Sequence, residues 1–145
     1  MKKIISVLIA FTTILSVCRA QPDKNKLLVP EKVKQALSEK YPSAKNVTWE
    51  KEKGNYEANW GGTSGEDNSA QFTPDGAFLE IAKAIPVEKL PDAIKKYINT
   101  HYKKHGRITE ASEITDAGEK KFYEAEVNGK GVRFDKDGMF VRSEK

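Results

Sequence analysis

The chain has 145 residues, of which 25 are basic and 21 acidic, and its formal net charge is +4. Lys2, Lys3 and Arg19 stand in the first 20 residues, which contain no acid, so residues 21–145 carry 25 − 3 = 22 basic and 21 acidic residues, a net charge of +1. This balance gives no reason to expect binding to nucleic acid or to an anionic membrane surface.

The first 20 residues are expected to be a secretory signal peptide. Lys2 and Lys3 precede an apolar run over residues 4–17, and small residues stand at the positions before Gln21. The run is shorter than the roughly 20 apolar residues of a membrane span. We therefore expect an exported protein, periplasmic or extracellular, with no membrane span after cleavage.

Cys18 is the only cysteine of the chain. The segment Leu15-Ser16-Val17-Cys18 resembles a lipoprotein cleavage box, although Val17 stands where a small residue is usual. The alternative to free export is therefore a lipoprotein tethered through Cys18. If cleavage falls after Ala20, the exported chain has no cysteine, which excludes disulfides and thiol chemistry.

The rest of the sequence contains an internal repeat. Residues 29–41, VPEKVKQALSEKY, return as residues 90–102, LPDAIKKYINTHY, at an offset of 90 − 29 = 61. FTPDGAF at 72–78 returns as FDKDGMF at 134–140, at an offset of 134 − 72 = 62. Two echoes in the same order indicate a duplication. The expected organisation is a signal peptide (1–20), a flexible linker (21–28), a first repeat (29–89) and a second repeat (90–145).

The first repeat begins with a helix. Pro30 suits its first turn, apolar residues recur at i, i+3, i+4 and i+8 from Val33 to Tyr41, and Pro42 ends it. Alternating and short apolar segments then predict four strands. These are expected over residues 47–52, 56–60, 69–72 and 77–81, with turns at Gly54-Asn55 and Pro74–Gly76 and a glycine-rich loop over 61–68.

The second repeat is expected to follow the same plan. A helix carries the same apolar spacing from Ile94 to Tyr102, and Gly106 is a natural terminator. Strands are expected over 108–115, 123–127, 132–134 and 139–142, with turns at 116–118, Asn128-Gly129 and Asp137-Gly138. The fold class is therefore α+β, two tandem repeats of a helix and a four-stranded antiparallel sheet. Each repeat of about 60 residues is marginal alone, so the two are expected to share a core or one continuous curved sheet.

Strand alternation predicts one buried and one solvated sheet face. The solvated face supplies the candidate partner-binding residues Glu50, Glu52, Glu57, Asn59, Glu124, Glu126 and Arg133. Trp49 and Trp60 belong to the core by alternation. Trp60 is added to the candidates in case the sheet edge leaves it open, because tryptophan is a frequent hot-spot residue.

Four more specific site hypotheses are weaker than their plain structural explanations. His101 and His105 could share a helix face, but zinc needs a further protein ligand. Asp135–Gly138 resembles the start of a calcium loop, whose closing glutamate would lie beyond the chain end. Gly61–Gly65 lacks the lysine and helix of a phosphate loop. The face carboxylates could form a catalytic pair, but a solvated strand explains them. We expect no metal, no cofactor and no catalytic residues.

The combination VPEKVKQALSEKYPSAKNVTWEKEKGNYEANW, FTPDGAFLEI and IPVEKLPDAIKKYI resembles the PepSY-like, beta-lactamase-inhibitor-like family of secreted bacterial proteins. The second repeat departs from its pattern, with Lys103 in place of Pro42 and Glu110 in place of Trp49. The resemblance implies tandem helix-plus-sheet lobes without catalytic apparatus and a periplasmic binding or inhibitory role. It supplies no binding residues to carry over.

The function expected from the sequence is a secreted non-catalytic binding module. Its partner would be another exported or envelope protein, met through the solvated sheet face and the 61–68 loop. One alternative is a small secreted metal-binding protein or enzyme. The other is a structural or stress protein of the envelope without a discrete ligand.

Overall fold

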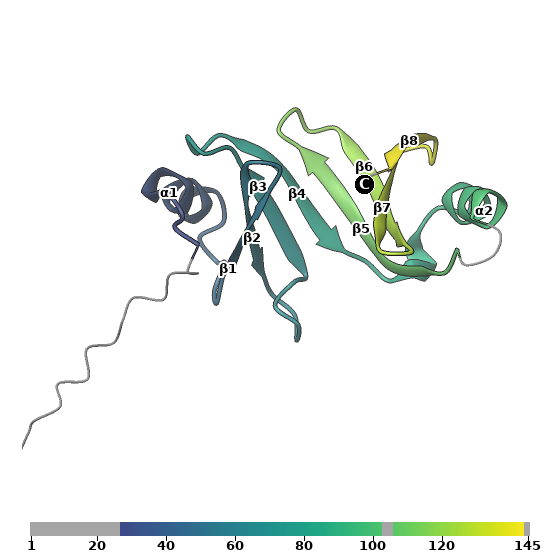
Figure 1. Ribbon diagram of the computed structural model, residues 1–145, viewed down its shortest axis with the longest axis horizontal. Coiled ribbons are helices and arrows are strands. Elements are labelled where there is room, and N and C mark those ends of the chain that lie inside the picture. Colours follow the sequence, from purple (N-terminus) through teal and green to yellow (C-terminus); the bar gives the residue numbers. More distant parts are fainter. Residues whose placement is uncertain (1–26, 103–105, 144–145) are drawn as a thin grey trace, which may run out of the picture.

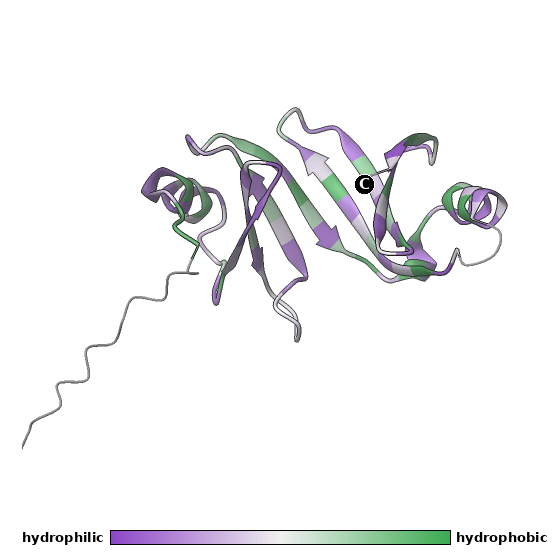
Figure 2. Ribbon diagram, viewed as in Figure 1, coloured by the Kyte–Doolittle hydropathy of each residue, from purple (hydrophilic) through white to green (hydrophobic). Residues whose placement is uncertain are grey.

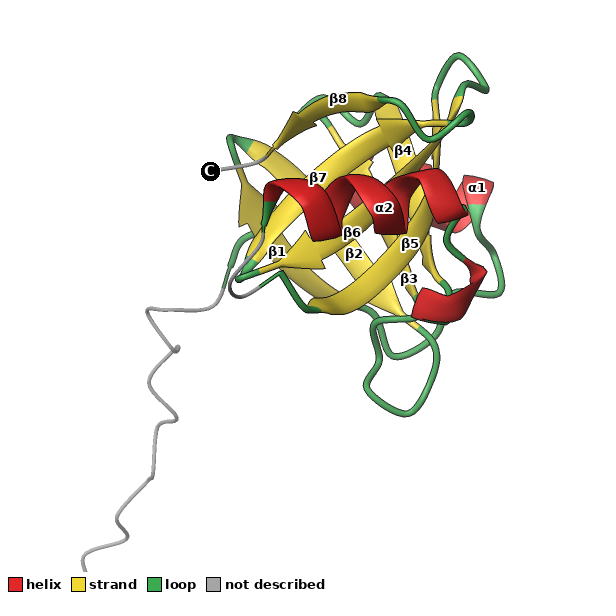
Figure 3. Cartoon of the chain, turned by 90° about the vertical axis from the view of Figure 1, so that its right-hand side faces the viewer, coloured by secondary structure: helices red, strands yellow, loops and turns green. Residues whose placement is uncertain are grey.

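The computed structural model describes residues 27–102 and 106–143. Over these residues the chain forms two α-helices and one eight-stranded antiparallel sheet, whose strand order β1 to β8 follows the chain. The helices lie at opposite ends of the molecule with the strands between them (Figure 1). A view from one end places α2 in front of the strands and α1 behind them (Figure 3). The expected α+β class is thus confirmed, with a single sheet running through both halves.

The element order matches the one expected from the sequence. The first half contains α1 (Glu31–Lys40), β1 (Thr48–Glu52), β2 (Asn55–Trp60), β3 (Asn68–Phe72) and β4 (Phe78–Ala84). A short 3-10 turn, η1 (Val87–Lys89), leads to α2 (Asp92–His101), β5 (Ile108–Asp116), β6 (Lys121–Val127), β7 (Lys130–Asp135) and β8 (Phe140–Ser143).

Helix α1 begins one residue later than the sequence suggested. Pro30 has an extended ψ of 144° and stands before the first helical residue, where its carbonyl accepts the backbone N–H of Val33 and Lys34. Pro91 has the same place before α2, with its carbonyl accepting from Ile94 and Lys95. In each helix the proline therefore caps the first turn rather than lying inside it.

Four of the five predicted turns are confirmed, whereas the β1–β2 turn and the role of Gly106 differ from the prediction. Asn128 and Gly129 both have positive φ and join β6 to β7, as their sequence predicts. The β1–β2 turn lies at Lys53-Gly54, one residue before the predicted position, since Asn55 already pairs with Glu52. Gly106 does not end α2, which stops at His101. A Cβ on it would meet the Tyr102 side chain at 2.6 Å, so close packing requires this glycine.

The repeated Asp-Gly turns pack against the helices. A Cβ on Gly76 would lie 2.9 Å from the Lys32 carbonyl oxygen in α1, and one on Gly138 would lie 3.0 Å from the Ala93 Cβ in α2. Both glycines also have φ above +80°. In each half, the repeated Asp-Gly motif therefore allows a turn to pack closely against the start of the helix. The turn is β3–β4 in the first half and β7–β8 in the second.

Each half has its own hydrophobic core between its helix and the sheet. Val33 and Leu37 of α1 pack with Phe72, and Ile94 and Ile98 of α2 pack with the strands around them, and no buried residue belongs to both clusters. The alternation of hydrophilic and hydrophobic residues along the strands is visible in Figure 2. Of the two expected ways to join the halves, the molecule uses the continuous sheet.

Strands β4 and β5 form this junction. They pair from Glu80 opposite Asp116 to Ala84 opposite Ser112. The pairing explains why β4 extends to Ala84, three residues beyond its predicted end, because the partner strand lies far along the chain and leaves no local signal. Leu27, which the sequence assigned to the linker, packs against the first core.

Candidate functional site

The polar residues of the two halves share one face of the sheet. In the first half the strand register places Glu50, Glu57, Gln71 and Glu80 in one row across β1 to β4. Tyr56 and Ala58, which flank Glu57, lie in the first core. The face assignment predicted from strand alternation is therefore correct in this half.

The second half continues the polar face. Glu124 on β6 lies opposite Ser112 on β5 and Arg133 on β7, while the flanking Tyr123 and Ala125 pack on the second core. A bulge between Ile108 and Glu110 shifts the phase of β5. It places Ile108 on the core side and Glu110 on the polar face, opposite Glu126.

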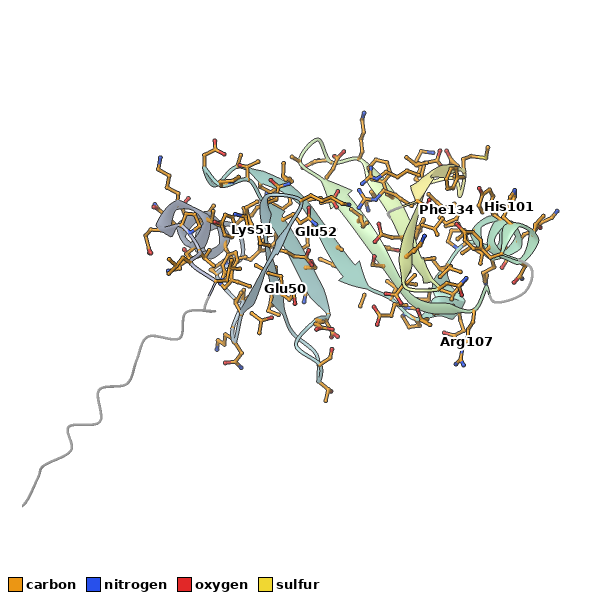
Figure 4. All side chains as sticks on the ribbon, in the orientation of Figure 1. Glu50, Lys51, Glu52, His101, Arg107 and Phe134 are labelled. Atoms are coloured by element: carbon orange, nitrogen blue, oxygen red, sulfur yellow. The ribbon has the colours of Figure 1, made fainter. Side chains whose placement is uncertain are left out.

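This face forms a groove of about 1000 Å³ that is lined by strands of both halves and by the β2–β3 loop. Its acidic residues are Glu50, Glu52, Glu57, Glu66, Asp67, Glu80, Glu88, Glu110, Glu124 and Glu126, and its basic residues are Lys53, Arg133 and Arg142. Figure 4 shows Glu50 and Glu52 on the strands between the two helices, with His101 on α2 at the outside. We call this surface, with these residues, the acidic groove.

Arg133 anchors the floor of the acidic groove. Its Nη1 and Nη2 donate to the two carboxylate oxygens of Glu80 at 2.8 Å each, and its Nε donates to Glu124 at 3.2 Å. Burial would lower the pKa of Arg133, but the hydrogen bonds and charge of Glu80, and then those of Glu124, outweigh it and raise the pKa above its usual value. The guanidinium therefore stays charged although the residue is only 6% exposed.

The candidate residues divide into three groups. Glu50, Glu52, Glu57, Glu124 and Glu126 line the groove as acids, and Asn59 lines it as a buried amide. Arg133 also lies on this face, but its ion pairs bury it, whereas the sequence placed it in solvent.

Trp60 lies apart from the groove, on the core side of β2. It is 8% exposed, and its ring centroid is 5.2 Å from that of Tyr41. This packing against Tyr41, the residue directly after α1, corrects the place of Trp60 among the candidates and agrees with the core position that alternation predicted. Trp49 is partly buried against the same core. Burial by these neighbours raises the pKa of the Tyr41 hydroxyl.

Sequence reasoning missed three of the groove's ten carboxylates, namely Glu80, Glu88 and Glu110. Glu66 and Asp67 also line the groove; they were not named individually, but they lie in the 61–68 loop that was expected to meet the partner. Because neighbouring residues of a strand face opposite sides of the sheet, a core position for Ile81 would have placed Glu80 on the polar face. Glu88 lies in the 3-10 turn η1 and Glu110 lies beyond a bulge, and strand alternation assigns no face at either place.

The candidate zinc and calcium sites considered from the sequence have plain structural explanations. In the part of the chain that the structure describes, no group of three His, Cys, Asp or Glu side chains could hold a metal ion. His101 stacks on Tyr97 at 3.9 Å between ring centroids, and His105 lies outside the described residues. Asp135 Oδ1 accepts the backbone N–H of Asp137 and of Met139, so the calcium-like segment closes a turn.

The acidic groove can attract and hold positive charge. Ten carboxylates face three basic side chains, a formal balance of 3 − 10 = −7. Three pairs of cross-strand neighbours in the groove carry like charge: two are acidic, Glu50 opposite Glu57 and Glu110 opposite Glu126, and one is basic, Arg133 opposite Arg142. Like charges directly opposite each other destabilise a sheet.

A family model described as "Putative beta-lactamase-inhibitor-like, PepSY-like" matches residues 21–66 and 60–142. The chain belongs to the PepSY-like family. The two matched segments together run from residue 21 to residue 142, so they include both halves of the sheet.

Solved structures share the fold of this PepSY-like protein. A "putative periplasmic" protein from Bacteroides eggerthii is 18% identical with a TM-score of 0.63, over 81% of this chain and 88% of the other. A DUF2874 family protein from Bacteroides uniformis gives the same identity and score, over 81% and 89%. A BLIP-like protein from Bacteroides fragilis is also 18% identical, with a TM-score of 0.55 over 83% and 88%.

No curated protein matches the chain. In the described part of this PepSY-like protein, neither helix is long and apolar enough to cross a membrane.

Proposed function

We propose that this PepSY-like protein is an exported, non-catalytic binding module that holds another protein in its acidic groove. The observation that carries the proposal is the groove itself. It has a volume of about 1000 Å³, draws its lining from both halves of one sheet and lies on the face that the helices leave uncovered. A concave face of this kind suits a protruding segment of a partner.

The lining favours a protein over a small organic ligand. Small-molecule sites are lined predominantly by hydrophobic and aromatic side chains with few polar groups. The acidic groove has ten carboxylates and no aromatic side chain among its lining residues. The inhibitor-like description of the family, and the BLIP-like description of one fold neighbour, point in the same direction.

The proposal includes the organisation of the chain. The first repeat would span residues 29–89 and the second 90–145, because each half has the order helix, then four strands, and its own core. Residues 1–20 would be the signal peptide and 21–28 a linker, in a periplasmic or extracellular protein. Mass spectrometry of the exported protein is expected to find Gln21 at the N-terminus. A diacylglycerol-modified Cys18 would instead show a tethered lipoprotein.

Site-specific photo-crosslinking tests the binding face. A photoreactive amino acid at Ser112 would lie in the acidic groove, and one at Thr100 would lie on the exposed side of α2. In cells of the organism that produces the protein, we expect adducts with a second protein from position 112 and none from position 100. Adducts from position 100 alone, or none from either position, would refute a groove that binds protein.

A further inference from the structure

We propose that the segment which enters the acidic groove is cationic: a loop or hairpin of the partner that carries several lysine or arginine side chains. This inference rests on the proposed function and adds the chemistry of the partner. Three observations carry it, namely the separation of charge over the molecule, the two acidic cross-strand pairs in the groove, and the donors that orient its carboxylates.

Charge is strongly separated between the groove and the remaining surface. The groove has a formal charge of 3 − 10 = −7. The other described residues include 14 basic and 9 acidic side chains, a balance of 14 − 9 = +5. A concave surface of one sign focuses the field and raises the local concentration of opposite charge. The near-neutral total of the exported chain conceals this separation.

The two acidic pairs have a cost that a cationic partner would remove. Glu50 and Glu57 are cross-strand neighbours in the first half, and Glu110 and Glu126 in the second. Such pairs are unfavourable in a sheet unless a positive charge lies between them. Both pairs line the groove. Ammonium or guanidinium groups of a partner would convert two repulsions into attractions, one in each half of the sheet.

Neutral donors orient one carboxylate of each pair. Ser69 Oγ donates to Glu57 at 2.5 Å and Gln71 Nε2 at 3.3 Å, while Thr109 Oγ1 donates to Glu126 at 2.7 Å. These bonds hold the carboxylates in place without neutralising them. Preorganised acceptors lose less side-chain entropy when a partner binds.

The size of the groove favours a chain segment over a free cation. No cluster of three metal-ligating side chains occurs in residues 27–102 and 106–143, and the carboxylates instead spread over strands of both halves and the β2–β3 loop. A volume of about 1000 Å³ exceeds what a single ion fills. A segment with several positive charges at strand-like spacing can meet both glutamate pairs together.

Three hairpin peptides on one scaffold provide the test. Four positions next to the turn carry lysine, glutamine or glutamate, and fluorescence anisotropy measures the affinity of each peptide for the exported protein. We expect the lysine hairpin to bind about tenfold or more tightly than the glutamine hairpin, and the glutamate hairpin not to bind. The affinity of the lysine hairpin should fall as salt rises, because salt screens exposed charges.

Glu50→Lys combined with Glu110→Lys is the matching variant. Both side chains are exposed, so folding should persist. Glu39→Lys combined with Glu119→Lys makes the same change of charge at exposed positions outside the groove. We expect the first variant to weaken binding of the lysine hairpin by about tenfold or more, and the second to change it less than about twofold.

Several results would overturn the inference. They are absent binding of the lysine hairpin, equal affinity for the glutamine hairpin, equal loss in the control variant, and complete displacement of the hairpin by magnesium at matched ionic strength. The last result would assign the groove to small cations. If crosslinking from Ser112 captures a partner whose contacting segment is neutral or acidic, the binding module stands and its cationic specificity fails.

Discussion

The contacts of Arg133 show that the sheet is strongly curved. Its strand, β7, lies three strands from β4, which carries Glu80. In a flat sheet, three spacings of about 4.8 Å separate such strands by roughly 14 Å. The two side chains nevertheless meet in a bidentate ion pair at 2.8 Å. This contact reaches across the acidic groove and ties the first half to the second.

Replacing Arg133 should therefore destabilise the fold. Arg133→Met keeps the length of the side chain but removes the bidentate ion pair with Glu80 and the ion pair with Glu124 inside an already acidic groove. We expect a loss of about 2–4 kcal/mol in the free energy of unfolding, measured by urea denaturation. Arg107→Met, at an exposed position, should stay within about 0.5 kcal/mol. If Arg133→Met left the free energy of unfolding unchanged, the ion pair would be dispensable for stability.

Asp75 gives a prediction of pH dependence at the β3–β4 turn. The Thr73 hydroxyl donates to its carboxylate, and this bond, more than the backbone bond or the charge of Lys32, lowers the pKa of Asp75. A carboxyl pKa that is lower in the folded state contributes stability above its unfolded value, and the contribution is lost as the pH falls through the folded value.

Thr73→Val removes the donor and should raise the pKa of Asp75 toward the ordinary aspartate value of 3.8. Carbon-detected NMR titration of the Asp75 carboxyl would measure the change. The carboxyl of Asp92 provides the internal control, because Lys95 lowers its pKa in the other half of the molecule. An unchanged titration of Asp75 in the variant would assign the effect to the backbone bond or to Lys32.

At the scale of elements, the glycines of the turns should differ in their tolerance of a side chain. Gly76 and Gly129 both have positive φ, so alanine at either position costs about 1–2 kcal/mol in backbone strain. A Cβ on Gly129 meets nothing within 4 Å, whereas one on Gly76 would lie 2.9 Å from the Lys32 carbonyl oxygen. Gly76→Ala should therefore cost at least about 1 kcal/mol more than Gly129→Ala in thermal or urea unfolding. Equal losses of stability in the two variants would mean that the turn and helix move apart at no cost to accommodate the Cβ.

The local elements could be predicted because their signals are local. Apolar spacing from Val33 and from Ile94 gave both helices, and Asn128-Gly129 gave its turn. The groove could be predicted only in part. Alternation gave the face of Glu57 and Glu124 but not the burial of Arg133, which depends on Glu80 three strands away.

Bulges and long-range pairing explain the remaining differences. Simple alternation from Ile108 would place Glu110 on the core side, but the bulge between them places it on the polar face. The concave face also buries Ile114 to 2% exposure, although this residue lies on the polar face, opposite Ala82. Neither feature has a signature within a few residues of sequence.

At the scale of the whole molecule, two separate cores are joined by a shared sheet. The β4–β5 ladder and the Glu80–Arg133 ion pair connect the halves, while their hydrophobic clusters have no buried residue in common. Halves of about 60 residues are only marginally stable alone. Loss of either core should therefore expose a long strand edge of the other half and destabilise it.

This coupling predicts that the molecule unfolds as one unit. Leu37→Ala in the first core and Ile98→Ala in the second should each cost about 2–5 kcal/mol, since both side chains are buried. Both tryptophans, Trp49 and Trp60, lie in the first half, so their fluorescence reports that half, while far-UV circular dichroism reports both. In Ile98→Ala, the urea midpoint from fluorescence should fall together with the midpoint from circular dichroism, because coincident transitions mark two-state unfolding. If the fluorescence midpoint stayed at its wild-type value while the circular dichroism became biphasic, the halves would be independent units and the β4–β5 ladder a passive connection.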